Sequence, residues 1–171
     1  MAAGDVTARY RASSNLTVTA LDGLASSSTH VTGWESAVID NTTDKDLDKL
    51  ISGKVTVESA GLAAGEIRIW AVPKLDDSTY AGGLDGTQSA ETTPFDDENG
   101  TNAAAVLLKS ITTDTTASQV YTWHMLSVAS AFGGCLPPYF SIFITQSTGT
   151  TLETTGNQVT VTGYAMNVAQ S

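Results

Sequence analysis

The densest group of carboxylates raises the question of a metal site. Asp44, Asp46 and Asp48 alternate with other residues, as the ligands of some calcium loops do. An EF-hand loop beginning at Asp44 would need glycine at its sixth position and glutamate at its twelfth, but Lys49 and Val55 stand there. Alternate residues of an extended strand share one face. We therefore expect the three aspartates to point together into solvent, on a charged connection between two strands.

A second acidic cluster, DDENGTN at 96–102, leaves two interpretations open. Its carboxylate and carbonyl oxygens could hold a calcium ion, or the segment is an exposed turn. A transition metal would need His or Cys ligands at a motif spacing, but His30, His124 and Cys135 are scattered along the chain. We predict no metal site and no cofactor.

Acid–base chemistry has one candidate residue. Glycoside hydrolysis needs two carboxylates across a cleft, and nearly all acidic residues here lie in turn-like segments. Glu35, next to Trp34, comes closest to a carboxyl group whose pKa an apolar setting would raise. The alternative is a polar strand position beside a packed indole. Cys135 follows two glycines and is typical of a turn. We predict no catalytic residue and no enzymatic activity.

The tryptophans Trp34, Trp70 and Trp123 offer a further possibility, a platform on which sugars stack. Large aromatic residues in a β-sandwich more often anchor its core, because each buries a large apolar area. We expect the three tryptophans to be core anchors.

Composition indicates an all-β protein. Charged residues make up 15% of the 171 residues, against roughly 25% in typical soluble domains, and Thr, Ser, Ala and Gly replace them. Thr and Val favour strands, whereas Ser and Gly favour turns. The net charge of -10 disfavours nucleic acid and anionic membranes as partners. No segment has the roughly 20 apolar residues of a membrane span, and the N-terminus lacks the apolar core of a signal peptide.

Charge is distributed unevenly along the chain. No Lys or Arg follows Lys109, and Glu153 is the one acidic residue after Asp114. A partner subunit that covers this region would explain the lack of charge, because interface cores are depleted of charged residues. A solvated sheet face that carries threonines in place of lysines explains it equally well.

Strand-like runs separated by turn signals predict a two-sheet β-sandwich of about eight strands, jelly-roll-like, with an immunoglobulin-like sandwich as the alternative. In 65–75, Ile67, Ile69 and Ala71 should share one face, Pro73 should end central pairing, and Gly53 should mark a bulge. Short helices are expected only near 46–50 and 128–132. The runs are NLTVTAL (15–21), ESAVID (35–40), DKLISGKVTVES (48–59), GEIRIWAVPKL (65–75), AAVLLKSITTD (104–114), QVYTWHMLSVA (119–129), YFSIFITQS (139–147) and QVTVTGYAMNVA (158–169).

Three parts follow from this pattern. Residues 1–14 form an N-terminal arm, and residues 15–171 form a single sandwich domain. Residues 76–102 form a long polar excursion, in which glycines, acidic residues and Pro94 argue against a regular element. Connections of this length are usually functional or bound to a partner.

The whole chain resembles small structural proteins of tailed bacteriophages, particularly the capsid decoration or cement proteins. The resemblance rests on NLTVTALDGLASSSTHVTGWESAVIDNTTDKDLDKLISGKVTV, GEIRIWAVPKLDDSTYAGGLDGTQSAET and SVASAFGGCLPPYFSIFITQSTGTTL. It implies a non-enzymatic protein of the virion, assembled in the host cytoplasm. Such a protein binds the major capsid protein on the capsid exterior as a homo-oligomer, a dimer or a trimer. A tail or fibre component with a receptor- or glycan-binding sandwich is the alternative.

Within this resemblance, Arg9, Tyr10 and Arg11 of the arm are the candidate capsid contact, since Arg and Tyr are favoured at the centres of interfaces. The 76–102 excursion is expected to be a second contact or an outward-facing tip. Disorder is the alternative for both segments.

Overall fold

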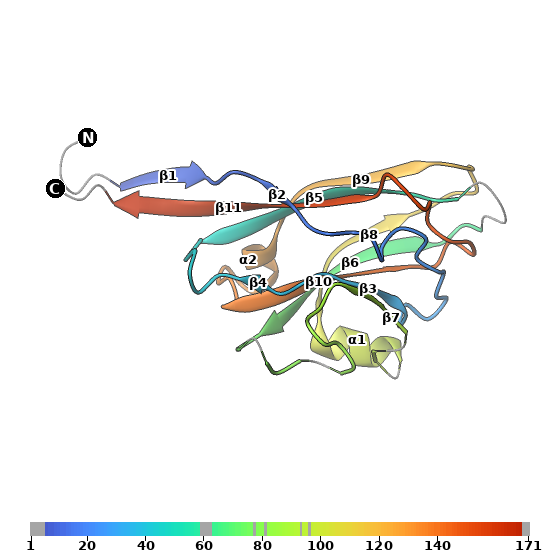
Figure 1. The fold of residues 1–171 in the computed structure, drawn as a ribbon, viewed down its shortest axis with the longest axis horizontal. Coiled ribbons are helices and arrows are strands. Elements are labelled where there is room, and N and C mark those ends of the chain that lie inside the picture. Colours follow the sequence, from blue (N-terminus) through green and yellow to red (C-terminus); the bar gives the residue numbers. More distant parts are fainter. Residues whose placement is uncertain are drawn as a thin grey trace.

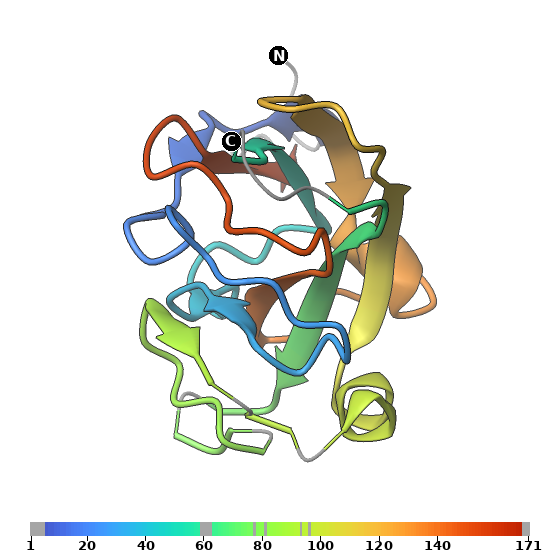
Figure 2. The ribbon, with the colours of Figure 1, turned by 90° about the vertical axis from the view of Figure 1, so that its right-hand side faces the viewer.

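Alternating apolar residues build two antiparallel sheets that pack face to face (Figures 1 and 2). The computed structural model describes residues 6–58, 63–76, 78–80, 82–92, 94–95 and 97–168. The first sheet has the strand order β1-β11-β5-β9, with β2 also paired to β11. The second has the order β7-β3-β10-β6-β8, with β4 also paired to β10. The predicted all-β sandwich is confirmed, whereas jelly-roll connectivity is not.

The described residues contain eleven strands and two short helices, more strands than the eight expected. Their bounds are β1 Val6–Tyr10, β2 Ser14–Asn15, β3 Gly33–Glu35, β4 Ile39–Asp40, β5 Asp48–Thr56, β6 Glu66–Lys74, β7 Ser89–Glu91, α1 Glu98–Ala104, β8 Val106–Thr112, β9 Val120–Ser127, α2 Val128–Ala131, β10 Tyr139–Gln146 and β11 Gln158–Val168. The extra strands are mostly pairs or triplets of residues. Such short elements leave almost no periodic signal in a sequence.

The main core lies between the two sheets. Side chains from the inner faces of β5, β6, β10 and β11 fill it, and the predicted period-two alternation places them there. Trp34 and Trp123 lie in the same core. The strand residues of this core are Ile51, Val55, Ile67, Ile69, Ala71, Phe140, Ile142, Ile144, Val159 and Val161.

A second, smaller core lies on the outer face of the second sheet. There Trp70, Val72 and Phe143 face away from the main core and pack against Leu84 and Phe95 of the excursion. The rings of Phe95 and Phe143 meet edge to face, with centroids 5.9 Å apart. The excursion therefore acts as a cover for the apolar outer face of β6 and β10.

The excursion also contains regular structure, contrary to the prediction. β7 pairs with β3, and helix α1 occupies part of the acidic DDENGTN segment. Asp97 caps α1 by accepting a hydrogen bond from the Gly100 amide at 2.8 Å. Glu98 in its first turn is paired with Arg68 of β6. An acidic turn-like sequence thus serves as a helix N-terminus.

Central pairing ends before Pro73 as predicted, whereas the predictions for 15–21 and 46–50 are wrong. β6 continues through Pro73 to Lys74 and stays paired with β10 there. Pairing with β8 has already ended at Ala71, so Pro73 lies in an edge segment, where the missing amide costs little. In the run 15–21 only Asn15 belongs to a strand, and residues 19–21 form a turn. The Leu21 amide donates a hydrogen bond to the Val18 carbonyl there, and the Leu21 side chain reaches the core. Residues 48–50 belong to β5, whereas the short helix near 128–132 is confirmed as α2.

A bulge lies next to Gly53, but its extra residue is on β9 and not on β5 as predicted, and it changes the face that β9 presents. The pairing of β5 with β9 shifts register between Ile51 and Gly53. Opposite this shift, Met125 has a positive φ of 51° and is exposed, while Leu126 turns toward the core. Tyr121 and Trp123 face inward, and after the bulge Leu126 is the next side chain that faces inward.

Gly53 leaves room for the indole of Trp123. A Cβ at Gly53 would overlap the Trp123 ring and approach the Gln158 carbonyl oxygen. We expect Gly53→Ala to lower the free energy of unfolding by about 2 kcal/mol, through overpacking. Lys54→Ala, an outward-facing change on the same strand, is the control and should have little effect. Urea denaturation of the two variants measures both values, and equal stabilities would show that the indole can move aside.

Candidate functional site

The aspartates of the opening cluster do not point together into solvent. Asp46 is buried, and its Oδ1 accepts a hydrogen bond from Arg11 Nε at 2.5 Å. Its Oδ2 lies 2.7 Å from Lys49 Nζ. Asn41 closes the loop, because its side-chain amide bonds the backbone amide and carbonyl of Asp46. A buried ion-pair network replaces the predicted solvated connection, since the chain folds back here onto β11.

The two flanking aspartates have different partners. Asp44 lies at the edge of the network, and a hydrogen bond from Lys49 lowers the pKa of its carboxyl group. Asp48 accepts hydrogen bonds from Ser127 Oγ at 2.6 Å and from the Ala129 amide at 2.8 Å, at the start of α2. Asp44 and Asp46 thus share Arg11 and Lys49, whereas Asp48 binds Ser127 and Ala129, and the three carboxylates do not converge as the ligand set of a calcium site.

Asp46 should be the energetic centre of this network. Asp46→Asn removes one partner of a buried ion pair, so we expect the free energy of unfolding to fall by about 3 kcal/mol. Asp44→Asn is the matched control, because the Asp44 side chain is 40% exposed and its loss should cost less than about 1 kcal/mol. Thermal unfolding of the wild type with and without millimolar calcium completes the test. A calcium-dependent rise in Tm that Asp46→Asn abolishes would show that the cluster binds the ion.

Glu35 is buried at the centre of a second polar network. Its Oε1 accepts a hydrogen bond from Ser141 Oγ at 2.9 Å and lies 3.2 Å from Lys74 Nζ. Its Oε2 accepts from the backbone amides of Asp85 and Gly86, at 3.2 and 3.3 Å. These contacts join β3, β6 and β10 to the excursion. A glycosidase carboxylate must face substrate, whereas the Glu35 side chain is fully buried and bonded within the chain.

Lys74 completes the Glu35 network. Burial lowers the pKa of Lys74, and the charge of Glu35 opposes that effect. Its Nζ also lies 3.7 Å from the centre of the Tyr80 ring, a cation–π contact. The carboxylates of Glu35, Asp85 and Glu91 come within 4.8 Å of one another, close enough to share a cation. Because four protein donors already occupy the Glu35 oxygens, we assign this group to anchoring the excursion.

His30 is buried on the outer side of the second sheet. Its Nδ1 lies 2.9 Å from Thr145 Oγ1, which also lies 3.4 Å from Trp70 Nε1. Burial lowers the pKa of His30, and the nearby charge of Arg68 lowers it further. His30 has a φ of 55° and belongs to a turn. It has a structural role and is remote from His124, which is exposed on β9.

Burial of His30 should make stability depend on pH. The pKa of His30 is lower in the folded state than its ordinary value of about 6.5, so below that value the unfolded chain binds a proton more readily. This stability contribution is complete above about pH 6.5 and decreases as the pH falls toward the folded pKa. His30→Asn tolerates the positive φ and should flatten the dependence of the unfolding free energy between about pH 5 and 7. His124→Asn, at an exposed position, should leave the pH dependence of the unfolding free energy as in the wild type. If His124→Asn flattened this dependence and His30→Asn did not, His30 would not be its source.

The three tryptophans are buried, with exposed fractions of 0% for Trp34 and 2% for Trp70 and Trp123. They anchor the two cores, as expected. Side chains that are almost fully covered cannot stack on a sugar, so the sugar platform is excluded.

The N-terminal segment forms a projecting two-stranded ribbon with the end of β11. β1 pairs with β11 from Val6↔Val168 to Tyr10↔Tyr164, and the two strands extend past the rest of the first sheet (Figure 1). Residues 6–10 of the predicted arm are therefore a strand; residues 1–5 lie outside the described part. The rings of Tyr10 and Tyr164 are in contact, with centroids 5.2 Å apart.

One face of this ribbon is apolar. Residues directly opposite in an antiparallel pair share a face, and alternate residues of a strand do the same. We define the apolar ribbon face by these residues: Val6, Ala8, Tyr10, Tyr164 and Met166. Val6, Tyr10 and Met166 are 53%, 59% and 54% exposed.

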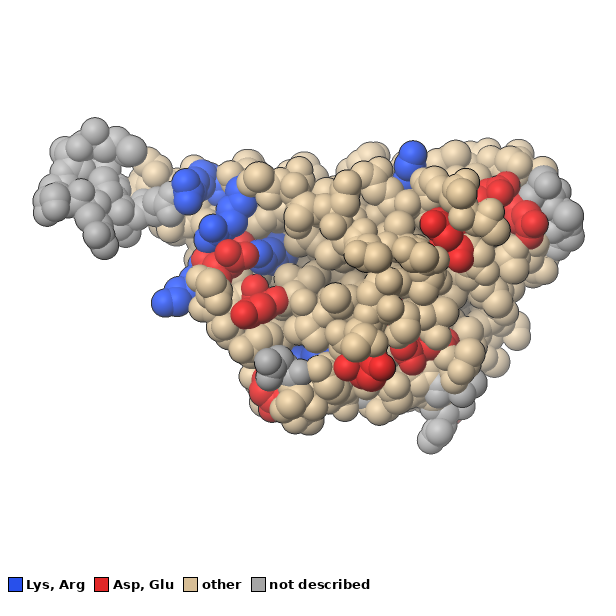
Figure 3. All heavy atoms as spheres, viewed as in Figure 1, with Lys and Arg blue, Asp and Glu red and all other residues tan. Residues whose placement is uncertain are grey.

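The three candidate capsid-contact residues, Arg9, Tyr10 and Arg11, lie in different surroundings in the structure. Tyr10 lies on the apolar ribbon face, and Arg9 is exposed on the opposite face. Arg11 lies at the base of the ribbon, where the carboxylate of Asp46 raises the pKa of its guanidinium group. Arg11 is thus committed to an ion pair within the chain. Figure 3 shows most of the visible Lys and Arg near this base, beside acidic side chains, with much of the remaining surface uncharged.

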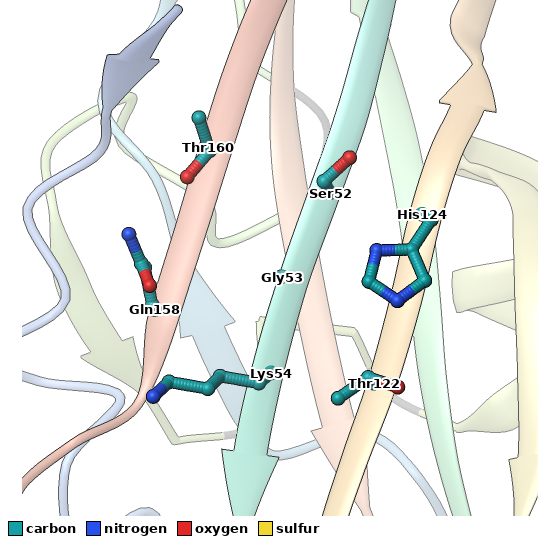
Figure 4. A pocket seen from close by; sticks show the side chains of 7 residues that line it. All are labelled: Ser52, Gly53, Lys54, Thr122, His124, Gln158 and Thr160. Atoms are coloured by element: carbon teal, nitrogen blue, oxygen red, sulfur yellow. The ribbon is translucent and has the colours of Figure 1, made fainter.

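A shallow hollow of about 190 Å³ lies on the outer face of the first sheet, over the Gly53 bulge. Figure 4 shows its side chains, which come from β5, β9 and β11 and carry no carboxylate. The lining residues are Ser52, Gly53, Lys54, Thr122, His124, Gln158 and Thr160. No local sequence pattern indicates this hollow, because the register of three strands brings its residues together.

Comparison with known protein families, curated proteins and solved structures finds no match for this chain. Within the described residues, no helix is both long and apolar enough to cross a membrane.

Proposed function

We propose that this chain is a non-enzymatic structural protein of a bacteriophage virion that binds the major capsid protein on the outside of the shell. The observation that carries the proposal is the projecting ribbon. A two-stranded ribbon is marginally stable by itself, and this one exposes Val6, Tyr10 and Met166 beyond the body of the sandwich. Exposed apolar surface of this kind is typical of an interaction site.

The internal chemistry of the chain supports a structural role. Asp46 and Glu35, which lie in the two buried polar networks, are held by Arg11, Lys49 and Lys74. These contacts stabilise the sandwich and leave both carboxylates without access to a substrate. A protein that binds the assembled shell and not its free subunits stabilises the shell by mass action, and several lattice contacts strengthen that binding by acting together.

The hollow over Gly53 favours a second candidate, a tail or fibre component that binds a receptor glycan. Hydroxyl, amide and imidazole groups surround it, and such groups hydrogen-bond to sugars. It lacks an exposed aromatic ring among its lining residues, and the three tryptophans are buried. The exposed ribbon therefore supports the capsid-binding proposal, and the hollow supports the glycan-binding alternative.

Binding to stripped capsids tests the proposal. We expect purified protein to saturate them at a fixed stoichiometry and to raise their disruption temperature. Tyr10→Ala removes the largest exposed ring of the apolar ribbon face and should weaken binding about tenfold, as expected for loss of an interface anchor worth more than 1 kcal/mol. Leu75→Ala is the matched control, because Leu75 is 88% exposed at the end of β6, away from the ribbon.

Point variants are preferable to deletion of residues 1–14. That deletion would also remove Arg11, whose loss leaves the buried Asp46 without its partner. Absence of binding to stripped capsids would overturn the proposal. A glycan-array signal that Lys54→Ala and His124→Ala abolish without unfolding the chain would favour the tail or fibre alternative.

A further inference from the structure

The outer edge of β1 carries unpaired main-chain groups. In the described part of the first sheet, β1 is paired on one side, with β11. The Arg11 amide bonds the Gly163 carbonyl at 2.8 Å, and hydrogen-bonded pairs alternate with non-bonded pairs in an antiparallel ladder. Arg9 and Thr7 therefore also bond β11, whereas Val6, Ala8 and Tyr10 direct their amides and carbonyls toward the open edge.

The close contact of Tyr10 with Tyr164 agrees with this phase. Side chains approach each other most closely in the non-hydrogen-bonded pairs of an antiparallel ladder, and these two rings lie 5.2 Å apart. The alternation of bonded and non-bonded pairs assigned from Arg11 is thus consistent with the contact between the two tyrosine rings.

Among the described residues, no proline, lysine, bulge or loop covers this edge, and Arg9 is the one charged residue of β1. Open edges are normally protected by proline, lysine, a bulge or a covering loop, because they are templates for further strands. β1 has the sequence VTARY, in which Val, Thr and Tyr favour strands. All five of its residues are exposed and pair with β11 in an unbroken register. The strand is therefore ready to accept another strand.

We propose that β1 pairs antiparallel with β1 of a second copy of this chain, about a twofold axis at Ala8. This register places Ala8 opposite Ala8, and Val6 opposite Tyr10, of the second copy. The outward groups of both strands then exchange about six hydrogen bonds, two for each of the three pairs. An aromatic residue opposite a β-branched one is a favourable cross-strand pair.

Charge selects this register. With the axis at Ala8, Arg9 lies opposite Thr7 of the second copy, so no like charges face each other. An axis at Tyr10 would place Arg9 opposite Arg11 of the second copy, and like charges directly opposite are destabilising. The small side chain of Ala8 also lets the two strands meet at the axis without steric conflict.

The dimer goes beyond the proposed function and does not depend on it. It joins two first sheets into one and places their apolar ribbon faces next to each other. The contact is short, five residues from each copy. It therefore falls in the class of small, weak interfaces, and we expect a dissociation constant on the order of micromolar.

Sedimentation velocity of the purified protein, without capsids, tests this pairing. The wild type should change from monomer to dimer as its concentration rises through the micromolar range. A8K and A8E should each remain monomeric, because each places two like charges opposite each other at the axis. An equimolar mixture of A8K and A8E should recover the dimer mass, and this recovery also shows that both variants are folded.

The control is V120K, on β9 at the opposite edge of the same sheet, where Val120 is 46% exposed. It should dimerise like the wild type. A monomeric wild type at concentrations up to about 1 mM, well above the range of specific weak dimers, would overturn the proposal. So would dimers of A8K or A8E alone, or a dimer that V120K disrupts and A8K does not. Since no capsid takes part, failure of this test leaves the capsid proposal to be judged by its own experiment.

Discussion

The structure depends on the burial of both faces of β6 and β10. Their inner side chains fill the space between the sheets, and their outer ones include the large apolar Trp70, Val72 and Phe143. An apolar outer face cannot remain in water without a large cost in free energy. A third layer is therefore required, and residues 76–102 supply it by bringing Leu84 and Phe95 onto the sheet (Figure 2).

Buried charges attach the irregular segments to this framework. Glu35 holds Lys74 and two amides of the excursion, and Asp46 holds Arg11 at the base of the ribbon. Glu35 accepts from four donors, and Asp46 is paired with Arg11 and Lys49. Such pairing is the condition under which a buried charge is tolerated. Acidic residues that resemble metal or catalytic sites in the sequence therefore attach loops to the sheets through buried hydrogen bonds and ion pairs.

The ribbon of β1 and β11 keeps apolar side chains exposed to solvent. It extends past the sandwich (Figure 1), with an apolar face on one side and an open edge along β1. The two surfaces correspond to the two proposed contacts, a capsid subunit on the face and a second copy at the edge. If both form, attachment to the shell becomes multivalent. The hollow over Gly53 lies on the same sheet but is built from polar groups.

The sequence by itself determined the fold class, the clearest strands and the burial of the tryptophans, because period-two alternation and large apolar side chains act locally. Only the tertiary structure decided the fate of the charged and polar segments. From the sequence Asp46 is expected to be solvated, because its partner Arg11 lies 35 positions away. The hydrogen-bond partner of Glu35, Ser141, is 106 positions away in the sequence. The excursion appeared irregular because its order comes from an apolar surface that other strands provide. The open edge of β1 likewise follows from its pairing with β11, which no local pattern encodes.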